Sequence, residues 1–240
     1  MVDMTHYRLI VADSADDLAR QAAERMACCI DQALSERDRA QIALAGGSTP
    51  RSAYARLGAE HLPWDRVDVL LGDERCVPPD DPASNARMLA ETLLAQPPAR
   101  AARFHPVPVD SLSPLEAAEA YEAMIATLCP GSPPCFDLVL LGLGDDGHTA
   151  SLFPGRASLH VTDRWVCLGE GKGLARISLT APVLSAARQV LFMVSGQEKA
   201  QALARLLNDQ ESSDRTPARL VQPASEVIIL ADAAASAGLH

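Results

Sequence analysis

The stretch LVLLGLGDDGHTASLFPG, Leu138 to Gly155, carries the clearest signal in this 240-residue sequence. It opens with an apolar run, LVLLGL, which is too short to cross a membrane and has the length of a buried parallel strand. Glycines and two aspartates follow, and then a single histidine, His148. Ligands of open parallel sheets bind beyond the carboxyl ends of the strands, which is where His148 is expected to lie. Since the unperturbed pKa of histidine is near neutrality, the pattern predicts a general base here.

Strand-like and helical patterns alternate on both sides of this stretch. We expect strands at Tyr7–Val11, Gln41–Ala45, Val67–Gly72, Leu138–Gly142, Arg176–Thr180, Val190–Ser195 and Glu226–Leu230. Helical patterns lie between them, near Ser14–Leu34, Pro50–Glu60, Ser84–Ala95, Pro114–Leu128 and Gln197–Leu207. This alternation predicts an α/β fold, a three-layer sandwich with a mostly parallel sheet. Cys129–Cys135 and Gly169–Gly173 are expected to be loops too short for linkers, so residues 1–240 are predicted to form one domain.

Composition narrows the class of protein. The chain is 48% hydrophobic, which is ample for a buried core, and its formal net charge is -10. Excess negative charge argues against nucleic acid and anionic membranes as partners. We see no transmembrane segment, and the N-terminus MVDMTHYRLIV lacks the pattern of a signal peptide. The six cysteines form no CxxC pair and no zinc spacing, which predicts reduced thiols in a cytoplasmic protein.

The loop AGGSTP, residues 45–50, directly follows the strand-like run QIALA. Gly46 and Gly47 allow the backbone to turn and to approach a ligand closely. Thr49 is a good N-cap and the proline after it suits the first helical position, so a helix is expected to begin here. The free N–H groups of Gly47, Ser48 and Thr49 would then face a phosphate. The alternative is a plain strand-to-helix turn.

A second loop, GDERCVPPDDPASNARM, covers residues 72–88 after the strand-like run VDVLL. Arg75 lies at the same expected sheet edge as the first loop, where a guanidinium can bind a phosphate with two hydrogen bonds. The alternative is a solvated acidic turn with a local ion pair. Asn85 is expected either to cap the next helix or to reach a sugar hydroxyl.

The segment VLFMVSGQEKA, residues 190–200, predicts a strand, an N-cap at Ser195 and a helix that carries Lys199. The chain has nineteen arginines and only two lysines, Lys172 and Lys199. A cation in the first helical turn opposes the helix dipole, and a bound anion would offset that cost. Lys199 is therefore a candidate phosphate ligand, with an ordinary surface lysine as the alternative.

The run GLGDDG matches a dinucleotide-binding fingerprint only superficially. Asp145 and Asp146 would place carboxylates where a pyrophosphate should bind, and Pro154 shortens the helix that the fingerprint requires. Chemistry without a cofactor fits better, with Asp146 orienting the His148 ring or favouring its charged form. No serine lies in a nucleophile motif, and His148 has no second histidine at metal-ligand spacing, so no metal is expected.

Four segments together resemble the 6-phosphogluconolactonase family over nearly the whole chain: AGGSTP, GDERCVPPDDPASN, GLGDDGHTASLFPG and RISLTAPVLSAARQVLFMVSGQEKA. The resemblance implies a fold of the sugar-phosphate isomerase and deaminase type. It also implies hydrolysis of 6-phospho-D-glucono-1,5-lactone in the oxidative pentose phosphate pathway, without a metal or cofactor.

The resemblance also implies roles for individual residues. His148 would be the general base, and Arg75 and Lys199 would hold the phosphate together with the loop Gly46–Thr49. Three further residues would line the site or contact the substrate, namely Asp146, Asn85 and Arg176. We expect the partner to be the small-molecule substrate, and the chain to be a monomer or a weak homodimer.

The nearest alternative is a glucosamine-6-phosphate deaminase, which is similar in fold and in two of the loops. That family has an acidic residue before the proline that follows DGH, where this chain has Phe153, and a tyrosine where it has Arg75. Both differences favour the lactonase. A further alternative is a non-catalytic sugar-phosphate sensor on the same fold. Such a sensor would normally carry a DNA-binding region, for which we expect no room in this acidic chain.

Overall fold

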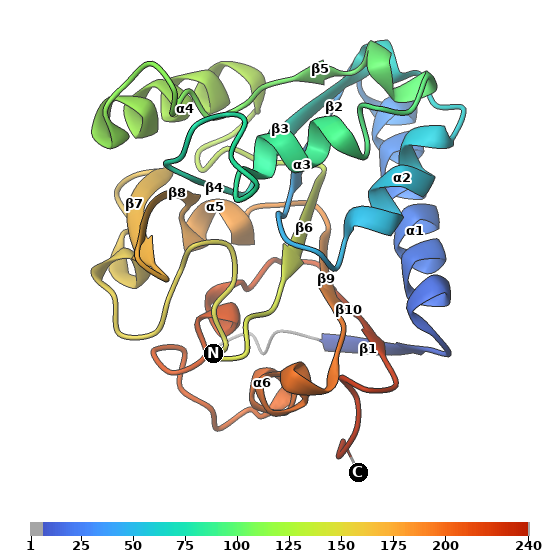
Figure 1. Cartoon of the computed structure of the whole chain (residues 1–240), viewed down its shortest axis with the longest axis vertical. Helices are drawn as coiled ribbons and strands as arrows, with labels where there is room; N and C mark the ends of the chain where they lie inside the picture. Colours follow the sequence, from blue (N-terminus) through green and yellow to red (C-terminus); the bar gives the residue numbers. More distant parts are fainter. Residues whose placement is uncertain (1–6, 240) are drawn as a thin grey trace.

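The computed structural model describes residues 7–239, and its centre is a seven-stranded parallel sheet (Figure 1). Its strands are β1 (Tyr7–Ala12), β2 (Ala40–Leu44), β3 (Val67–Leu71), β5 (Arg103–Phe104), β6 (Leu138–Gly142), β9 (Val190–Val194) and β10 (Val227–Asp232). They lie in the order β1-β10-β9-β6-β2-β3-β5, and each neighbouring pair is parallel. The predicted α/β fold with a mostly parallel sheet is confirmed.

The burial of each strand reflects its position in the sheet. Strands β2, β3 and β9 are buried at every position, as expected for parallel strands that are covered on both faces. The edge strand β1 is only partly buried. β6, the strand that leads to His148, lies between β2 and β9, so the carboxyl ends of three adjacent strands meet beside the histidine.

Helices cover both faces of this sheet. They are α1 (Ala15–Glu36), α2 (Arg51–Ala59), α3 (Asn85–Glu91), α4 (Pro114–Leu128), α5 (Ala181–Ser185) and α6 (Ala200–Leu207). Short 3₁₀ turns lie at Trp64–Arg66, Pro98–Ala101, Ala157–His160, Gln197–Lys199 and Pro217–Leu220. Figure 1 shows α1 and α2 on one side of the sheet and α4 and α5 on the other, which confirms the predicted layering.

A second, antiparallel sheet of three strands departs from the expected fold. It contains β4 (Asp73–Arg75), β7 (Val166–Gly171) and β8 (Leu174–Leu179) in the order β4-β8-β7. The strand expected at Arg176–Thr180 is present as β8, but it belongs to this second sheet and not to the parallel one. The expected loop Gly169–Gly173 is in fact the end of β7 and the turn into β8. Glycine-rich strands give a weak sequence signal, and the pairing of β8 with β4 joins segments about a hundred residues apart.

Two of the predicted N-caps are also wrong. α2 begins at Arg51, with Pro50 in the cap position and no side-chain cap, so Thr49 is not an N-cap. Ser195 is not one either, because its Oγ donates to Asp232 Oδ2 at 2.5 Å. Tertiary contacts have drawn this hydroxyl away from the backbone N–H groups that a cap would satisfy.

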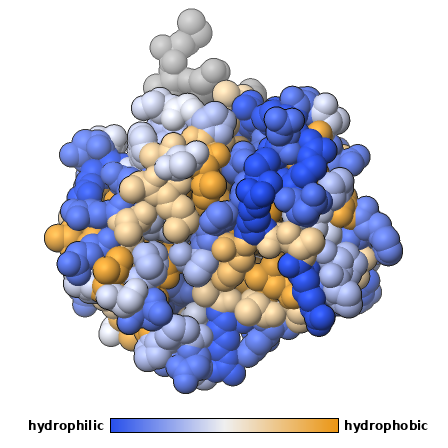
Figure 2. Space-filling model, turned by 90° about the horizontal axis from the view of Figure 1, so that it is seen from above, coloured by the Kyte–Doolittle hydropathy of each residue, from blue (hydrophilic) through white to orange (hydrophobic). Residues whose placement is uncertain are grey.

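Further findings concern the surface and the thiols. Seen from above, the face in Figure 2 is mainly hydrophilic with small apolar areas. No helix formed by residues 7–239 is long and apolar enough to cross a membrane. All six cysteines are free thiols. Residues 1–6, on which the prediction of no signal peptide partly rests, lie outside the described residues.

Candidate active site

A pocket of about 310 Å³ opens where β2, β6 and β9 end. The loops that follow these strands form most of its wall, and side chains of the small antiparallel sheet complete it. Eight of the ten predicted site residues line the pocket: Gly46, Gly47, Ser48, Thr49, Arg75, His148, Arg176 and Lys199. The other two, Asp146 and Asn85, lie behind His148 and Arg75 and bond to them.

His148 and Asp146 form a close pair on the loop after β6. His148 Nδ1 lies 2.5 Å from Asp146 Oδ1, which also accepts the backbone N–H of His148 at 2.9 Å. Burial would raise the pKa of Asp146, but the hydrogen bonds from His148 outweigh it and hold this pKa at about 2. An ionised acceptor keeps a hydrogen on Nδ1, which leaves Nε2 free to take a proton.

The glycines of GLGDDG make room for this pair. A methyl group on Gly144 would lie 2.0 Å from His148 Nδ1 and 2.7 Å from Asp146 Oδ1. The Gly144 N–H donates to the His148 carbonyl at 2.8 Å, and the Gly147 N–H donates to Gly144 at 3.0 Å. The loop is thus a closed turn that fits tightly around the imidazole. It does not form the phosphate-binding N-terminus of a helix.

Phe153 supports the other side of the histidine ring. The centroids of the two rings are 4.4 Å apart, with 31° between their planes. The Arg176 guanidinium carbon lies 5.3 Å from the centroid of the Phe153 ring. Phe153 itself is buried. Sequence reasoning used Phe153 only to compare families and did not foresee its contact with His148, because their spacing in sequence does not fix the path of the loop.

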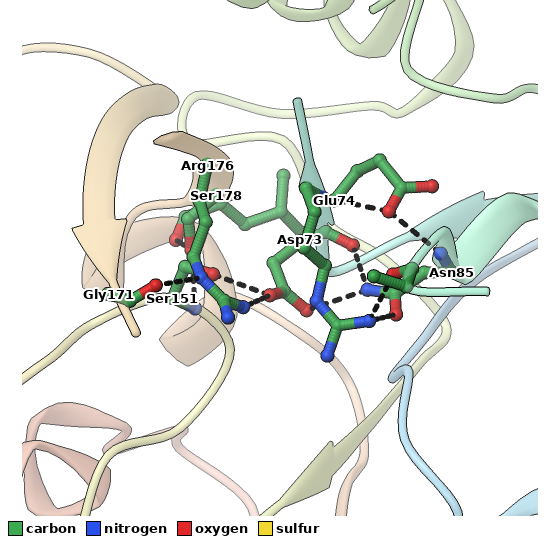
Figure 3. A network of polar contacts seen from close by, with 10 residues as sticks. Asp73, Glu74, Asn85, Ser151, Gly171, Arg176 and Ser178 are labelled. Atoms are coloured by element: carbon green, nitrogen blue, oxygen red, sulfur yellow. Dashed lines mark hydrogen bonds and ion pairs between the residues drawn. The ribbon is translucent and has the colours of Figure 1, made fainter. Parts of the chain in front are cut away.

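Arg75 is held in place by the second loop. Its Nη1 donates to the Ala83 carbonyl at 2.6 Å and to Asn85 Oδ1 at 2.5 Å. Asn85 also donates through Nδ2 to the Asp73 carbonyl at 2.8 Å, and Figure 3 shows these two residues side by side. The expectation that Asn85 caps α3 is wrong, because Ser84 is the N-cap and its Oγ accepts the backbone N–H of Arg87. Asn85 is almost fully buried and positions Arg75 instead.

The first loop packs directly on this asparagine. A methyl group on Gly46 would lie 1.7 Å from Asn85 Oδ1, so only glycine fits there. Gly47 adopts φ +94°, which is the left-handed backbone expected of this turn. The loops after β2 and β3 are therefore packed against each other at the pocket.

A buried polar network anchors Arg176, as Figure 3 shows. Asp73 Oδ2 accepts a hydrogen bond from Ser151 Oγ at 2.5 Å and lies 3.8 Å from Arg176 Nη1. The Arg176 Nε donates to the Gly171 carbonyl at 3.1 Å. Sequence reasoning did not assign Asp73 or Ser151 to the site. Asp73 follows a strand end, which is the one signal that could have found it.

The charges around the pocket favour an anion. Six formally charged side chains line it: Asp73, Arg75, Lys172, Arg176, Glu198 and Lys199. Four are cations and two are carboxylates, so the lining has an excess of two positive charges in a protein of net charge -10. A phosphate monoester carries a comparable negative charge at pH 7, and this lining therefore suits one. Within residues 7–239, no group of three or more potential ligands is arranged to hold a metal ion.

Comparisons with known proteins find similar proteins over most of this chain. The family model described as glucosamine-6-phosphate isomerases/6-phosphogluconolactonase matches residues 13–230. The chain is similar to the 6-phosphogluconolactonase of Synechocystis, with 42% identity over 214 residues, covering 88% of this chain and 89% of that protein. It is also similar to the structure of 6-phosphogluconolactonase from Trypanosoma brucei, with a TM-score of 0.87 and 30% identity, covering 99% of this chain and all of the other.

The fold is shared with a second kind of protein. A monomeric glucosamine-6-phosphate deaminase of known structure is similar to the chain with a TM-score of 0.80 and 21% identity, covering 95% of this chain and 98% of that one. At this identity the likeness concerns the fold alone. The site residues therefore have to distinguish the activities.

Proposed function

The chain belongs to the family of glucosamine-6-phosphate isomerases and 6-phosphogluconolactonase, and on that basis we propose that it hydrolyses 6-phospho-D-glucono-1,5-lactone to 6-phosphogluconate. The observation that carries the proposal is the pair of His148 and ionised Asp146 in a pocket with excess positive charge. The relatives named 6-phosphogluconolactonase support the same activity, which belongs to the pentose phosphate pathway.

In the proposed reaction His148 acts first as a base. Its Nε2 takes a proton from a water molecule as the water oxygen bonds to C1 of the lactone. The carbonyl oxygen of C1 then carries a negative charge, which nearby hydrogen-bond donors stabilise. When the bond between C1 and the ring oxygen breaks, the protonated His148 returns its proton to that oxygen. Asp146 holds the ring in one orientation and stabilises its charged form.

The phosphate supplies binding far from the reacting carbon. Arg75 and Lys199, with the loop Gly46–Thr49, form the proposed phosphate site, and Arg176, which also lines the pocket, is a further proposed contact of the substrate. Contacts with a non-reacting group fix the orientation of the lactone and lower the entropic cost of reaction.

The environment of His148 argues against deamination. Ring opening of an amino sugar phosphate calls for an acidic group where this chain has Phe153. That side chain is buried and lies against the His148 ring. The position offers no proton donor, so the geometry favours hydrolysis of a lactone, in which the ring oxygen takes its proton from the histidine.

A direct assay tests the proposal. The purified chain is given 6-phospho-D-glucono-1,5-lactone in one reaction and glucosamine 6-phosphate in another. We expect rapid hydrolysis of the first and no release of ammonia from the second. Unphosphorylated gluconolactone should be a much poorer substrate. Activity only on the amino sugar would contradict the proposal.

The proposal also covers the location, partner and oligomeric state of the protein. We propose a cytoplasmic protein whose partner is its small-molecule substrate, as a monomer or weak homodimer. Six free thiols support the location, since the cytoplasm keeps thiols reduced.

A further inference from the structure

The hairpin of β7 and β8 brings a residue with no assigned role into the pocket. Strand β7 ends at Gly171, which pairs with Leu174, so Lys172 and Gly173 form a two-residue turn. Lys172 lines the pocket. The chain has only two lysines, and both line this one pocket, although nineteen arginines are spread over the sequence.

The backbone of Lys172 is unusual. Lys172 has φ +54° and Gly173 has φ +76°, and two-residue hairpin turns with two positive φ angles favour asparagine, aspartate or glycine at the first position. Within residues 7–239, Ala150 is the other non-glycine residue with positive φ, and it also lines the pocket. Such conformations cost free energy and are concentrated at functional sites, so they point to a role for the lysine side chain.

The hairpin is fixed against the loop that carries His148. A methyl group on Gly171 would lie 2.3 Å from the Phe153 ring, so the backbone of β7 rests on that ring. The Arg176 Nε donates to the Gly171 carbonyl at 3.1 Å and ties β8 to the end of β7. Packing and a hydrogen bond therefore hold the turn over the loop that carries His148.

The charge of Lys172 acts at the reacting end of the pocket. Burial raises the pKa of Asp146, the hydrogen bonds from His148 lower it, and Lys172 lowers it further through its positive charge. The lysine therefore lies within electrostatic range of the carboxylate that orients the base. The proposed phosphate ligands come from other segments, the loop after β2, the end of β4 and the turn after β9.

We propose that the ammonium group of Lys172 contacts the carbonyl oxygen of the lactone and stabilises the negative charge that forms on it. This role rests on the proposed lactonase activity. When water adds to C1 and His148 takes its proton, the electron pair of the carbonyl bond moves to the oxygen beside Lys172. The pair returns as the bond to the ring oxygen breaks, so Lys172 keeps its proton throughout. A fixed cation at this oxygen favours the transition state more than the neutral ground state.

Substitutions at the turn test this role. K172N removes the charge and places a favoured residue at the strained position, and K172Q removes the charge while keeping much of the length. We expect both to lower kcat by about 10²-fold, in the range found for lost oxyanion donors. KM and inhibition by inorganic phosphate should change less than about threefold, and the Tm of K172N should equal or exceed that of the native chain. K172R should retain more activity than either.

Two further variants complete the comparison. E170Q removes a charge from an exposed side chain on the same strand, outside the pocket lining, and should leave kcat unchanged. K199Q should instead raise KM and weaken inhibition by phosphate. Native kcat in both K172N and K172Q would overturn the role of Lys172, and so would a loss of phosphate inhibition with kcat preserved. If the native chain does not hydrolyse the lactone, the proposed function itself fails.

Discussion

The ring of Phe153 lies against the imidazole of His148, with 4.4 Å between the ring centroids. The proposed base is therefore held by a carboxylate at Nδ1 and by an apolar ring against its face. The same phenylalanine contacts Arg176 and the backbone of Gly171, so it joins the loop that carries His148 to the small antiparallel sheet. A change at Phe153 should thus affect catalysis as well as stability.

We expect F153L to lower kcat several-fold with little change in KM, because leucine fills part of the space but cannot stack on His148. The stability cost should be about 1–2 kcal/mol, as for other reductions of a buried side chain. Steady-state kinetics and urea unfolding provide the two measurements. F136L is the matched control, since Phe136 is fully buried outside the pocket lining. Equal losses of activity in the two variants would contradict a specific role for Phe153.

H148A should reduce kcat by about 10²–10⁴-fold, because removal of a general base costs that much. The circular dichroism spectrum and Tm should stay close to native. H160A is the control, because the side chain of His160 is 72% exposed and does not line the pocket. Near-native turnover by H148A would rule out the proposed mechanism.

D146N should lower kcat by about 10²–10⁴-fold, since an amide can donate to Nδ1 and favour the wrong tautomer. Its stability should also depend less on pH. The folded pKa of Asp146 is about 2, below the unfolded value of about 3.9, so its ionised form stabilises the fold above pH ~4. That contribution is lost as the pH falls from about 4 to 2. The difference in Tm between the native chain and D146N should shrink over this window.

The control for D146N is D145N, a neighbouring carboxylate that is exposed and makes no side-chain contact with His148. It should retain native kcat. A D145N variant as impaired as D146N would show that the loop responds to any change of charge, and not to loss of the Asp146–His148 hydrogen bond.

G144A should be nearly inactive, because the added methyl group would overlap the His148 ring and force it away from Asp146. Folding should be affected less than activity, since the loop can shift toward the open pocket. G72A is the comparison: the nearest atom to its new methyl group would be the Leu44 carbonyl oxygen, at an ordinary 3.8 Å. Steady-state kinetics and Tm separate the effect on activity from the effect on folding. Full activity in G144A would contradict the tight packing of Gly144 against His148.

R75A should raise KM for the phosphorylated lactone by about 10–10²-fold, as expected for the loss of a charge-assisted hydrogen bond. Inhibition by inorganic phosphate should weaken in parallel, while hydrolysis of unphosphorylated gluconolactone should hardly change. R100A alters an exposed arginine outside the pocket lining and should behave as the native chain does. An unchanged KM in R75A would remove Arg75 from the phosphate site.

N85A should share part of the R75A phenotype, although Asn85 does not line the pocket. Asn85 Oδ1 accepts a hydrogen bond from Arg75 Nη1, and the loss of this bond leaves the guanidinium free to move. Phosphate inhibition measures this positioning role. If N85A loses stability but keeps native inhibition by phosphate, the asparagine serves only the packing of Gly46.

The sequence by itself determined the parallel sheet and the site at its edge. Continuous apolar runs such as LVLL in β6 can be stable only when both faces are covered, and this property is local to each run. The glycines around His148 and at Gly46 likewise mark places where the backbone needs room. These signals depend on a few adjacent residues, so they can be read without knowing the partners of each segment.

Only the tertiary structure decided which side chains meet at the site. The small sheet, the support of Arg75 by Asn85 and the contact of Phe153 with His148 depend on packing that local patterns do not encode. Lys172 shows this most clearly: its segment reads as a glycine-rich loop, yet pairing of β7 with β8 directs it into the pocket. Periodicity and turn chemistry report on neighbours in sequence, whereas contacts between distant segments determine which charged side chains line a pocket.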